Sequence, residues 1–262
     1  MNPWPQQPTS RQLLPTRAQL TMSSIRSTGN GSPEEPYVLT VTSHKGGTGR
    51  TTLALALAWL WGQRGLKVTL MDADPVQAAL LVACGPVGCR WPNVTTVAAP
   101  DGVGTIPANQ DVVVIDSPPA TEQLAQVGLR KSNGVVLCCL ADSLSLGTLP
   151  AATQAVREAK ISNPNLDLLG IAVSVFNPLD LDQTRCLSLL RGAHGGLFVE
   201  PPIPVRPELR DWPLTAGADL PDGPGRQALR ALADVFRDQI ADAGWPQFAN
   251  VQRDKRAFAT RG

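Results

Sequence analysis

Short, continuously apolar runs alternate with longer mixed segments from Tyr37 onward. The runs are rich in Val, Ile and Leu, which predicts strands that are buried on both faces. These predicted strands are 37–43, 67–72, 111–116, 134–141 and 168–176. The segments between and after them favour helices, which we predict at 51–65, 121–131, 148–160, 181–192 and 226–241. Buried strands that alternate with helices predict an α/β fold with a doubly wound, mostly parallel sheet flanked by helices.

Two of the predicted helices differ in how far they are buried. The segment 51–65 is apolar nearly all round, which indicates a helix that is covered on most faces. The segment 226–241 instead carries one apolar stripe, which is typical of a helix packed on a sheet by one face. The stripe consists of Leu229, Leu232, Phe236 and Ile240.

The remaining sequence divides the chain into a domain and two tails. Residues 1–36 are rich in Pro, Ser, Thr, Gln and Gly and have no sustained periodicity, which predicts a disordered tail. The predicted domain spans 37–243. Residues 244–262 contain basic residues and scattered aromatics without a clean amphipathic face, so we predict a flexible tail and disfavour a membrane-surface helix.

Composition limits the classes of partner. The net charge is +1, so no global basic field points to nucleic acid, and any DNA contact needs a local patch. From residue 200 onward, nine basic residues stand against nine acidic ones, and a solvated face is an equal alternative to a DNA surface. The candidate DNA-binding residues are Arg206, Arg210, Arg226, Arg230 and Arg237.

Cysteine usage and hydropathy bear on the compartment. The five cysteines include no CxxC pair, which favours reduced thiols over a disulfide framework or a zinc site. We see neither a signal peptide nor an apolar run long enough to cross a membrane. The sequence therefore predicts a cytoplasmic protein.

The stretch SHKGGTGRTT (43–52) joins the first predicted strand to the first predicted helix. Its glycines allow successive backbone N–H groups to point inward, and the following helix adds its N-terminal dipole, so the turn predicts an anion-binding nest. The strict phosphate-loop pattern G-x-x-x-x-G-K-[ST] is not matched, because His44 replaces the first glycine and Arg50 replaces the lysine. Gly49 and Thr51 fit the pattern.

Three carboxylates follow the second and third predicted strands. Asp72 and Asp74 lie in LMDADP, and Asp116 lies in VVVIDSPP. Ligands of parallel sheets bind beyond the carboxyl ends of the strands, so these side chains and the glycine loop converge on one edge. Thr51 and Asp116 would then hold Mg²⁺. The alternative is that the aspartates only cap the turns that follow the strands.

Several motifs in this order resemble the ParA/MinD family of deviant Walker A ATPases. The family hallmark KGGxGK[ST] compares with KGGTGRT at 45–51, and its D-x-D-P-Q motif compares with DADP at 72–75, although Val76 precedes Gln77 here. VVVIDSPP at 112–119 resembles the family's hydrophobic-D-x-P-P. The resemblance covers nearly all of 37–243, is closest to the small partition type, and implies a P-loop NTPase fold with ATP and Mg²⁺ as cofactors.

The resemblance also implies roles for individual residues. Lys45 would reach across an ATP-sandwiched homodimer to the partner's phosphates, Asp74 would position the attacking water, and Thr51 and Asp116 would bind Mg²⁺. Asn177 would contact adenine, and the backbone of 204–208 would close the base pocket. The implied nucleotide-binding residues are Gly46, Gly47, Thr48, Gly49, Arg50, Thr51, Thr52, Asp72, Asn177 and Pro204.

Arg50 leaves three interpretations open. It can grip the phosphates and support catalysis, it can permit binding with very slow hydrolysis, or the loop can be degenerate. Arginine is planar and bulkier than lysine, so the exchange is not neutral. We include Lys45, Asp74 and Arg50 among the catalytic candidates.

The function that the resemblance implies is an ATP-dependent dimerising switch for plasmid or chromosome partition or for cargo positioning. Hydrolysis would be slow and stimulated by a ParB-like centromere-binding or adaptor protein, and the protein would associate with the nucleoid. The alternatives are a nucleotide-binding module that does not hydrolyse and a MinD-like positioning ATPase at the membrane.

Overall fold

A parallel sheet forms the centre of the domain. The computed structural model describes residues 35–75, 89–212 and 218–251. Within them the sheet has seven strands in the order β3-β2-β4-β1-β5-β6-β7, and every paired neighbour runs parallel. The predicted doubly wound α/β fold is therefore confirmed. The strands are β1 Tyr37–Ser43, β2 Val68–Asp72, β3 Val94–Ala98, β4 Val112–Asp116, β5 Gly134–Leu140, β6 Asp167–Ser174 and β7 Phe198–Val199.

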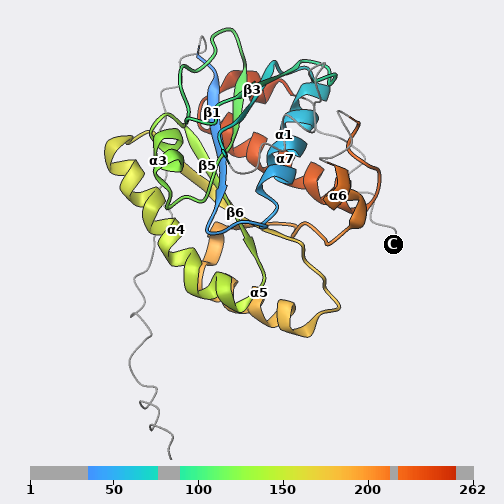
Figure 1. The fold of residues 1–262 in the computed structure, drawn as a ribbon. Coiled ribbons are helices and arrows are strands. Elements are labelled where there is room, and N and C mark those ends of the chain that lie inside the picture. Colours follow the sequence, from blue (N-terminus) through green and yellow to red (C-terminus); the bar gives the residue numbers. More distant parts are fainter. Residues whose placement is uncertain (1–34, 76–88, 213–217, 252–262) are drawn as a thin grey trace, which may run out of the picture.

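Helices cover both faces of this sheet. Figure 1 shows α3 and α4 on one side and α1 and α7 on the other. Strand β5 shows why both sides are needed: Val136 and Cys138 pack into the cluster with α1 and α7, whereas Leu137 and Cys139 pack into the cluster with α4. The helices are α1 Arg50–Gln63, α3 Gln123–Arg130, α4 Ser143–Ser162, α5 Leu181–His194, α6 Pro207–Asp211, α7 Pro224–Asp242 and α8 Pro246–Ala249.

The structure adds elements that the sequence pattern did not predict. Strand β3 was missed because its side chains are mostly exposed. Only Val94 is buried, so the strand lacks the continuous apolar run of the central strands. Helix α4 begins at Ser143 rather than at 148, with Asp142 as its N-cap and Pro150 inside it. The helix is stabilised by packing of its apolar face, whose buried residues are Leu149, Ala152, Ala155, Val156 and Ala159.

The domain continues past the predicted boundary at residue 243. Trp245, Phe248 and Val251 are buried, and the Phe248 ring packs edge-on against Trp61 and Tyr37. The prediction of a flexible tail from residue 244 is therefore wrong for residues 244–251. Residues 252–262 and the predicted tail up to residue 34 lie outside the described residues.

Helix α6 is attached to the rest of the domain through two indoles. Trp212 is the C-cap of α6 and stacks on Trp91, with ring centroids 5.5 Å apart and an interplanar angle of 19°. Both indole N–H groups donate to the carbonyl oxygen of Ala218, at 3.0 Å from Trp212 and 3.1 Å from Trp91. The segment that precedes β3 thus supports the segment that carries α6.

The last turn of α1 packs directly against the segment before β3. A Cβ on Gly62 would lie 2.6 Å from the carbonyl oxygen of Pro92 and 2.5 Å from a methyl of Val94. Both distances are far below van der Waals contact, and the carbonyl oxygen of Pro92 belongs to the backbone, which cannot easily move away. Glycine at this position is therefore required by the close approach of helix and strand.

We expect Gly62→Ala to destabilise the protein by about 1–3 kcal/mol, because overpacking outweighs the better helix propensity of alanine. Gly147 provides the matched control, since it lies on the exposed side of α4 and an added Cβ there meets nothing within 4 Å. Gly147→Ala should raise stability by about 0.5–1 kcal/mol. Urea denaturation measures both changes, and equal effects of the two substitutions would contradict this account of Gly62.

Candidate functional site

The phosphate loop forms where β1 passes into α1. Gly47 and Gly49 adopt φ angles of 74° and 75°, a left-handed conformation that favours glycine. At Gly49 an added Cβ would also lie 2.8 Å from the Ser174 hydroxyl oxygen at the end of β6. That hydroxyl donates a 2.5 Å hydrogen bond to the carbonyl oxygen of Thr48. Ser174, the last residue of β6, therefore helps to fix the loop.

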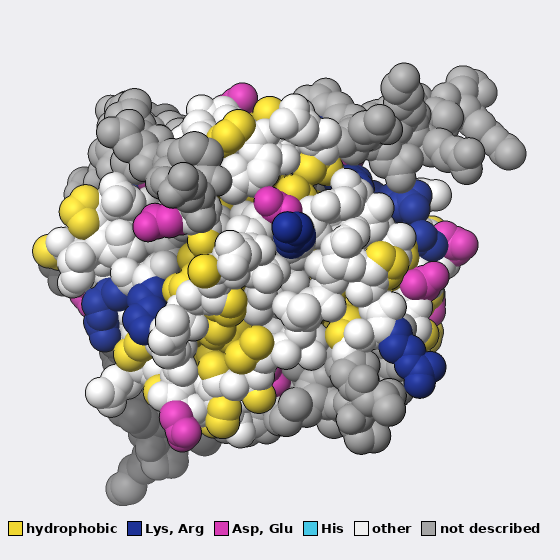
Figure 2. Space-filling model, turned by 90° about the horizontal axis from the view of Figure 1, so that it is seen from above, with side chains coloured by type: hydrophobic (Ala, Val, Ile, Leu, Met, Phe, Trp, Pro, Cys, Tyr) yellow, Lys and Arg dark blue, Asp and Glu magenta, His cyan; other side chains and the backbone are white. Residues whose placement is uncertain are grey.

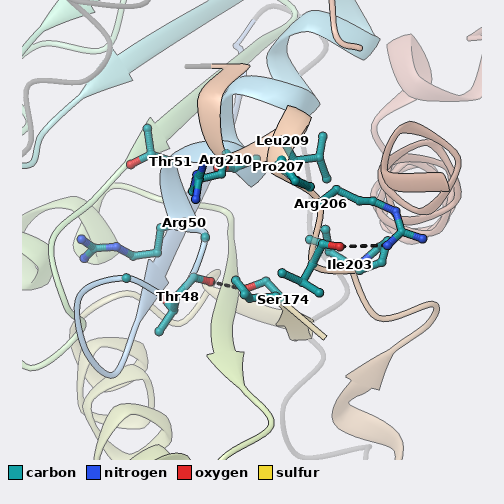
Figure 3. A pocket seen from close by; sticks show the side chains of 15 residues that line it. Thr48, Arg50, Thr51, Ser174, Ile203, Arg206, Pro207, Leu209 and Arg210 are labelled. Carbon is teal, nitrogen blue, oxygen red and sulfur yellow. Dashed lines mark hydrogen bonds between the residues drawn. The ribbon is translucent and has the colours of Figure 1, made fainter. Parts of the chain in front are cut away.

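A cavity of about 350 Å³ opens between this loop and α6. Figure 3 shows Thr48 and Arg50 on the loop side and Pro207 and Leu209 across the cavity. The lining thus joins a nest of backbone amides at the N-terminus of α1 to a partly apolar wall, which suits a phosphate and a flat base. The lining residues are Gly47–Thr52, Ser174, Val175, Ile203–Pro207, Leu209 and Arg210.

Most of the predicted nucleotide-binding residues line this cavity. Gly47 to Thr52 and Pro204 do. Asn177 is not among the lining residues; its side-chain oxygen accepts a hydrogen bond from the Leu179 N–H. The contact of Asn177 with a base stays a prediction.

The three predicted carboxylates meet at the carboxyl edge of the sheet. Asp72 and Asp116 end adjacent strands and are paired in register, and the Asp74 N–H donates to Asp72 Oδ1 at 3.1 Å. All three residues are at most 5% exposed. The Thr51 hydroxyl, from the first turn of α1, donates to Asp116 Oδ2 at 2.7 Å.

Asp116 has a strongly raised pKa. Burial raises its pKa to about 7, and the charges of Asp72 and Asp74 act in the same direction, while the Thr51 hydrogen bond and Arg50 act against the increase. Its Oδ1 atom is buried and has no hydrogen-bond partner among the described residues. An orphaned carboxylate oxygen beside a threonine hydroxyl is a donor set that suits Mg²⁺.

Arg50 extends from the cavity wall to Asp74. Its Nη2 atom donates to Asp74 Oδ2 at 2.8 Å, and the two side chains are only 2% and 4% exposed. The residue at the phosphate-loop lysine position therefore contacts a carboxylate of the chain itself. This contact was not predicted from the sequence, because the direction of the side chain depends on a residue 24 positions away.

Lys45 is also paired within the chain. Its Nζ atom lies 2.8 Å from Asp142 Oδ2, and Asp142 caps α4 by accepting the Ser145 N–H. Burial alone would raise the pKa of Asp142, but the hydrogen bonds from Lys45 and Ser145 lower it below its usual value. Asp142 was missed in the sequence, although it lies just after β5 and directly before a helix, as an N-cap does.

The late arginines do not form a single basic surface. Arg237 is 3% exposed, pairs with Asp234 and Asp238, and donates to the Val251 carbonyl, so its inclusion in a DNA-binding patch is wrong. Arg226 lies over the Trp59 ring and pairs with Asp222. On the face shown in Figure 2, the basic side chains stand in small separate groups.

Comparisons with known proteins place this site in a family. The family model described as the CobQ/CobB/MinD/ParA nucleotide binding domain matches residues 39–216. The chain belongs to this family. The resemblance to the ParA/MinD ATPases that the phosphate loop predicted is thereby confirmed.

Individual relatives agree with this assignment. The chromosome-partitioning ATPase Soj of Thermus thermophilus is 26% identical over 242 residues, which cover 78% of this chain and 97% of Soj. A Borrelia burgdorferi B31 protein assigned to plasmid partition and bound to AMPPNP has the same fold, with a TM-score of 0.64, 18% identity and coverage of 78% and 100%. MinD of Pyrococcus horikoshii OT3 with Mg-ADP gives a TM-score of 0.57 and 19% identity, over 79% of this chain and 97% of MinD.

Hydropathy of the described helices adds one observation. None of the helices in residues 35–75, 89–212 and 218–251 is long and apolar enough to cross a lipid bilayer.

The raised pKa of Asp116 predicts a pH dependence in the metal-free protein. The folded protein keeps this proton to about pH 7, whereas the unfolded chain releases it near the ordinary pKa of 3.8. The folded state thus binds more protons between these values, and its stability falls as the pH rises from about 4 to about 7. Asp116→Asn should flatten this part of the stability profile.

Denaturant titrations at pH 5 and pH 7.5, in the presence of a chelator, measure the effect. Asp101→Asn, at an exposed position, is the control and should keep the wild-type pH dependence. A profile for Asp116→Asn that is as steep as that of the wild type would show that another group is responsible.

Proposed function

We propose that the protein is an ATP-dependent switch of the partition type, which binds ATP with Mg²⁺ in the cavity beside the phosphate loop. The observation that supports this most strongly is the Thr51–Asp116 hydrogen bond, at 2.7 Å, beside the left-handed glycine loop. It joins a hydroxyl at the helix N-terminus to a buried carboxylate with one oxygen unpartnered. Mg²⁺ characteristically binds through one or two such groups together with phosphate oxygens.

The parts of the nucleotide have distinct places in this proposal. Backbone amides of 46–51 bind the phosphates, and Thr52 lies one residue further along the same first turn. Thr51 binds Mg²⁺ directly and Asp116 holds it through water. The base lies against the wall formed by Ile203 to Pro207 and by Leu209. The Mg²⁺ ion neutralises phosphate charge when it is bound.

Dimerisation would complete the switch. In this proposal Lys45 leaves Asp142 when ATP is present and contacts the phosphates bound by a second copy. The pair is solvent-accessible, with side-chain exposures of 24% and 37%, so it contributes little stability and its separation costs little. A ParB-like partner would stimulate turnover, and the exposed Arg206 and Arg210 are the late arginines that remain candidates for DNA contact.

The hydrolytic step would require Asp74 to orient a water against the terminal phosphate, with Asp72 supporting it. The Arg50–Asp74 pair holds Asp74 Oδ2 in a direct charge-assisted contact. This contact specifically favours the second candidate function, a nucleotide-dependent module with little or no hydrolysis. The MinD-like alternative has less support, because Phe248 of α8 is buried in the core.

Thr51→Val keeps the shape of the side chain and removes the hydroxyl that donates to Asp116. We expect Mg²⁺-dependent ATP affinity to fall at least tenfold, while the fold is retained. Calorimetric titration of ATP with and without Mg²⁺ measures this. Thr148→Val is the control, since that half-buried hydroxyl on α4 donates to the Leu144 carbonyl instead. If wild-type protein binds no nucleotide, or if Thr51→Val binds Mg-ATP as tightly as wild type, the proposed site is wrong.

A second test addresses turnover and assembly. Wild type should hydrolyse ATP slowly, and Asp74→Ala should reduce the rate further; equal rates would favour the module that does not hydrolyse. Light scattering with AMPPNP and Mg²⁺ should report a dimer that Lys45→Ala prevents. Lys131→Ala is the control, since that lysine binds the carbonyls of Val103 and Gly104 instead. A monomer in wild type under all nucleotide conditions would refute the dimerising switch.

A further inference from the structure

The guanidinium group of Arg50 has two amino groups in different situations. Nη2 donates to Asp74 Oδ2 at 2.8 Å. Nη1 is buried and finds no hydrogen-bond partner among the described residues. A buried donor without an acceptor is unfavourable, and native proteins keep few of them. Nη1 is thus an unfilled donor on a side chain that is 2% exposed.

The surroundings of Arg50 indicate what kind of group would fill this position. Arg50 is the first residue of α1 and lines the cavity together with the loop residues before it. Backbone amides and the N-terminal dipole of α1 favour an anion there. A phosphate oxygen is an acceptor of the correct charge for Nη1.

Arginine differs from lysine in its ability to serve two acceptors in fixed directions. The guanidinium presents five donors in a rigid plane, whereas an ammonium is a compact point charge on a flexible stem. One planar group can therefore hold a carboxylate by one amino group and a phosphate by the other. Because position 50 holds arginine where the phosphate-loop pattern has lysine, one side chain can contact a carboxylate and a phosphate at the same time.

We propose that Arg50 links Asp74 to the terminal phosphate of the bound nucleotide, with Nη2 on the carboxylate and Nη1 on the phosphate. This inference rests on the proposed function, since it assumes that a nucleoside triphosphate occupies the cavity. Asp74 acts in it as a positioning residue that aims Arg50. A nucleoside diphosphate leaves Nη1 unpaired, so the link makes the site selective for the triphosphate.

A double-mutant cycle on the full chain tests the link. The probes are AMPPNP and ADP, both with Mg²⁺, and the measured quantity is the ratio of their dissociation constants. We expect Arg50→Gln to reduce the preference for AMPPNP at least tenfold and Asp74→Asn to reduce it several-fold. In the double variant, Asp74→Asn should add nothing to the effect of Arg50→Gln, because the carboxylate acts through the arginine.

Arg64 provides a matched control. It pairs with Asp234 at 2.8 Å, with side-chain exposures of 11% and 14%, at the opposite end of α1. Arg64→Gln removes a similar ion pair far along the helix from the phosphate loop, and should lower stability while keeping the wild-type preference for AMPPNP. A loss of preference in this control would mean that destabilisation alone explains the effect.

The other possible results of the double-mutant cycle also support or contradict the proposed link. An unchanged preference in Arg50→Gln excludes the phosphate contact. An equal effect of Asp74→Asn with and without Arg50 excludes the link, and a higher preference in Asp74→Asn means that carboxylate and phosphate compete for Arg50. If Arg50→Gln does not fold alone, the double variant should still prefer AMPPNP less than Asp74→Asn does, since the two differ only at position 50, and an equal preference would contradict the phosphate contact. Wild type that binds neither probe refutes the proposed function itself, whereas binding without the cycle's coupling refutes only the link.

Discussion

Three buried carboxylates at one edge of a sheet are the constraint on which the rest of this site depends. Asp72, Asp74 and Asp116 are each at most 5% exposed, and their mutual repulsion has to be offset within the protein. Part of the offset is a proton, because the pKa of Asp116 rises to about 7. Another part is the guanidinium of Arg50. The direction of the Arg50 side chain follows from this concentration of negative charge, since its Nη2 atom donates to Asp74 Oδ2.

The sequence pattern predicted the parts of the fold whose signal is local. Five central strands and the long helices were recognised because their apolar runs are continuous or periodic. Strand β3 was not, because pairing with β2 holds it in place while most of its side chains stay partly exposed. Residues 244–251 were misread for a similar reason. The stretch is too short for its pattern to predict packing, and Trp245 and Phe248 are placed by ring contacts with Tyr37 and Trp61, far away in the chain.

The candidate site shows the same division between local and distant information. Glycine spacing and strand-end aspartates predicted where a phosphate and a cation would bind, since both follow from chain order in a parallel sheet. The partners of the two basic side chains did not follow from it. Arg50 reaches Asp74 and Lys45 reaches Asp142 through contacts that depend on burial and on side-chain rotamers. Such contacts can be identified only from the three-dimensional structure, in which the strand ends lie side by side.

The stacked indoles of Trp91 and Trp212 can serve as an intrinsic fluorescent probe of the cavity wall. Trp212 closes α6, whose residues form one wall of the cavity, and its indole lies on that of Trp91 at 5.5 Å. Indole emission depends on the polarity and the neighbouring rings around the chromophore. A displacement of α6 by a ligand alters both for this pair, so the intrinsic fluorescence of the unlabelled chain records the state of the cavity wall.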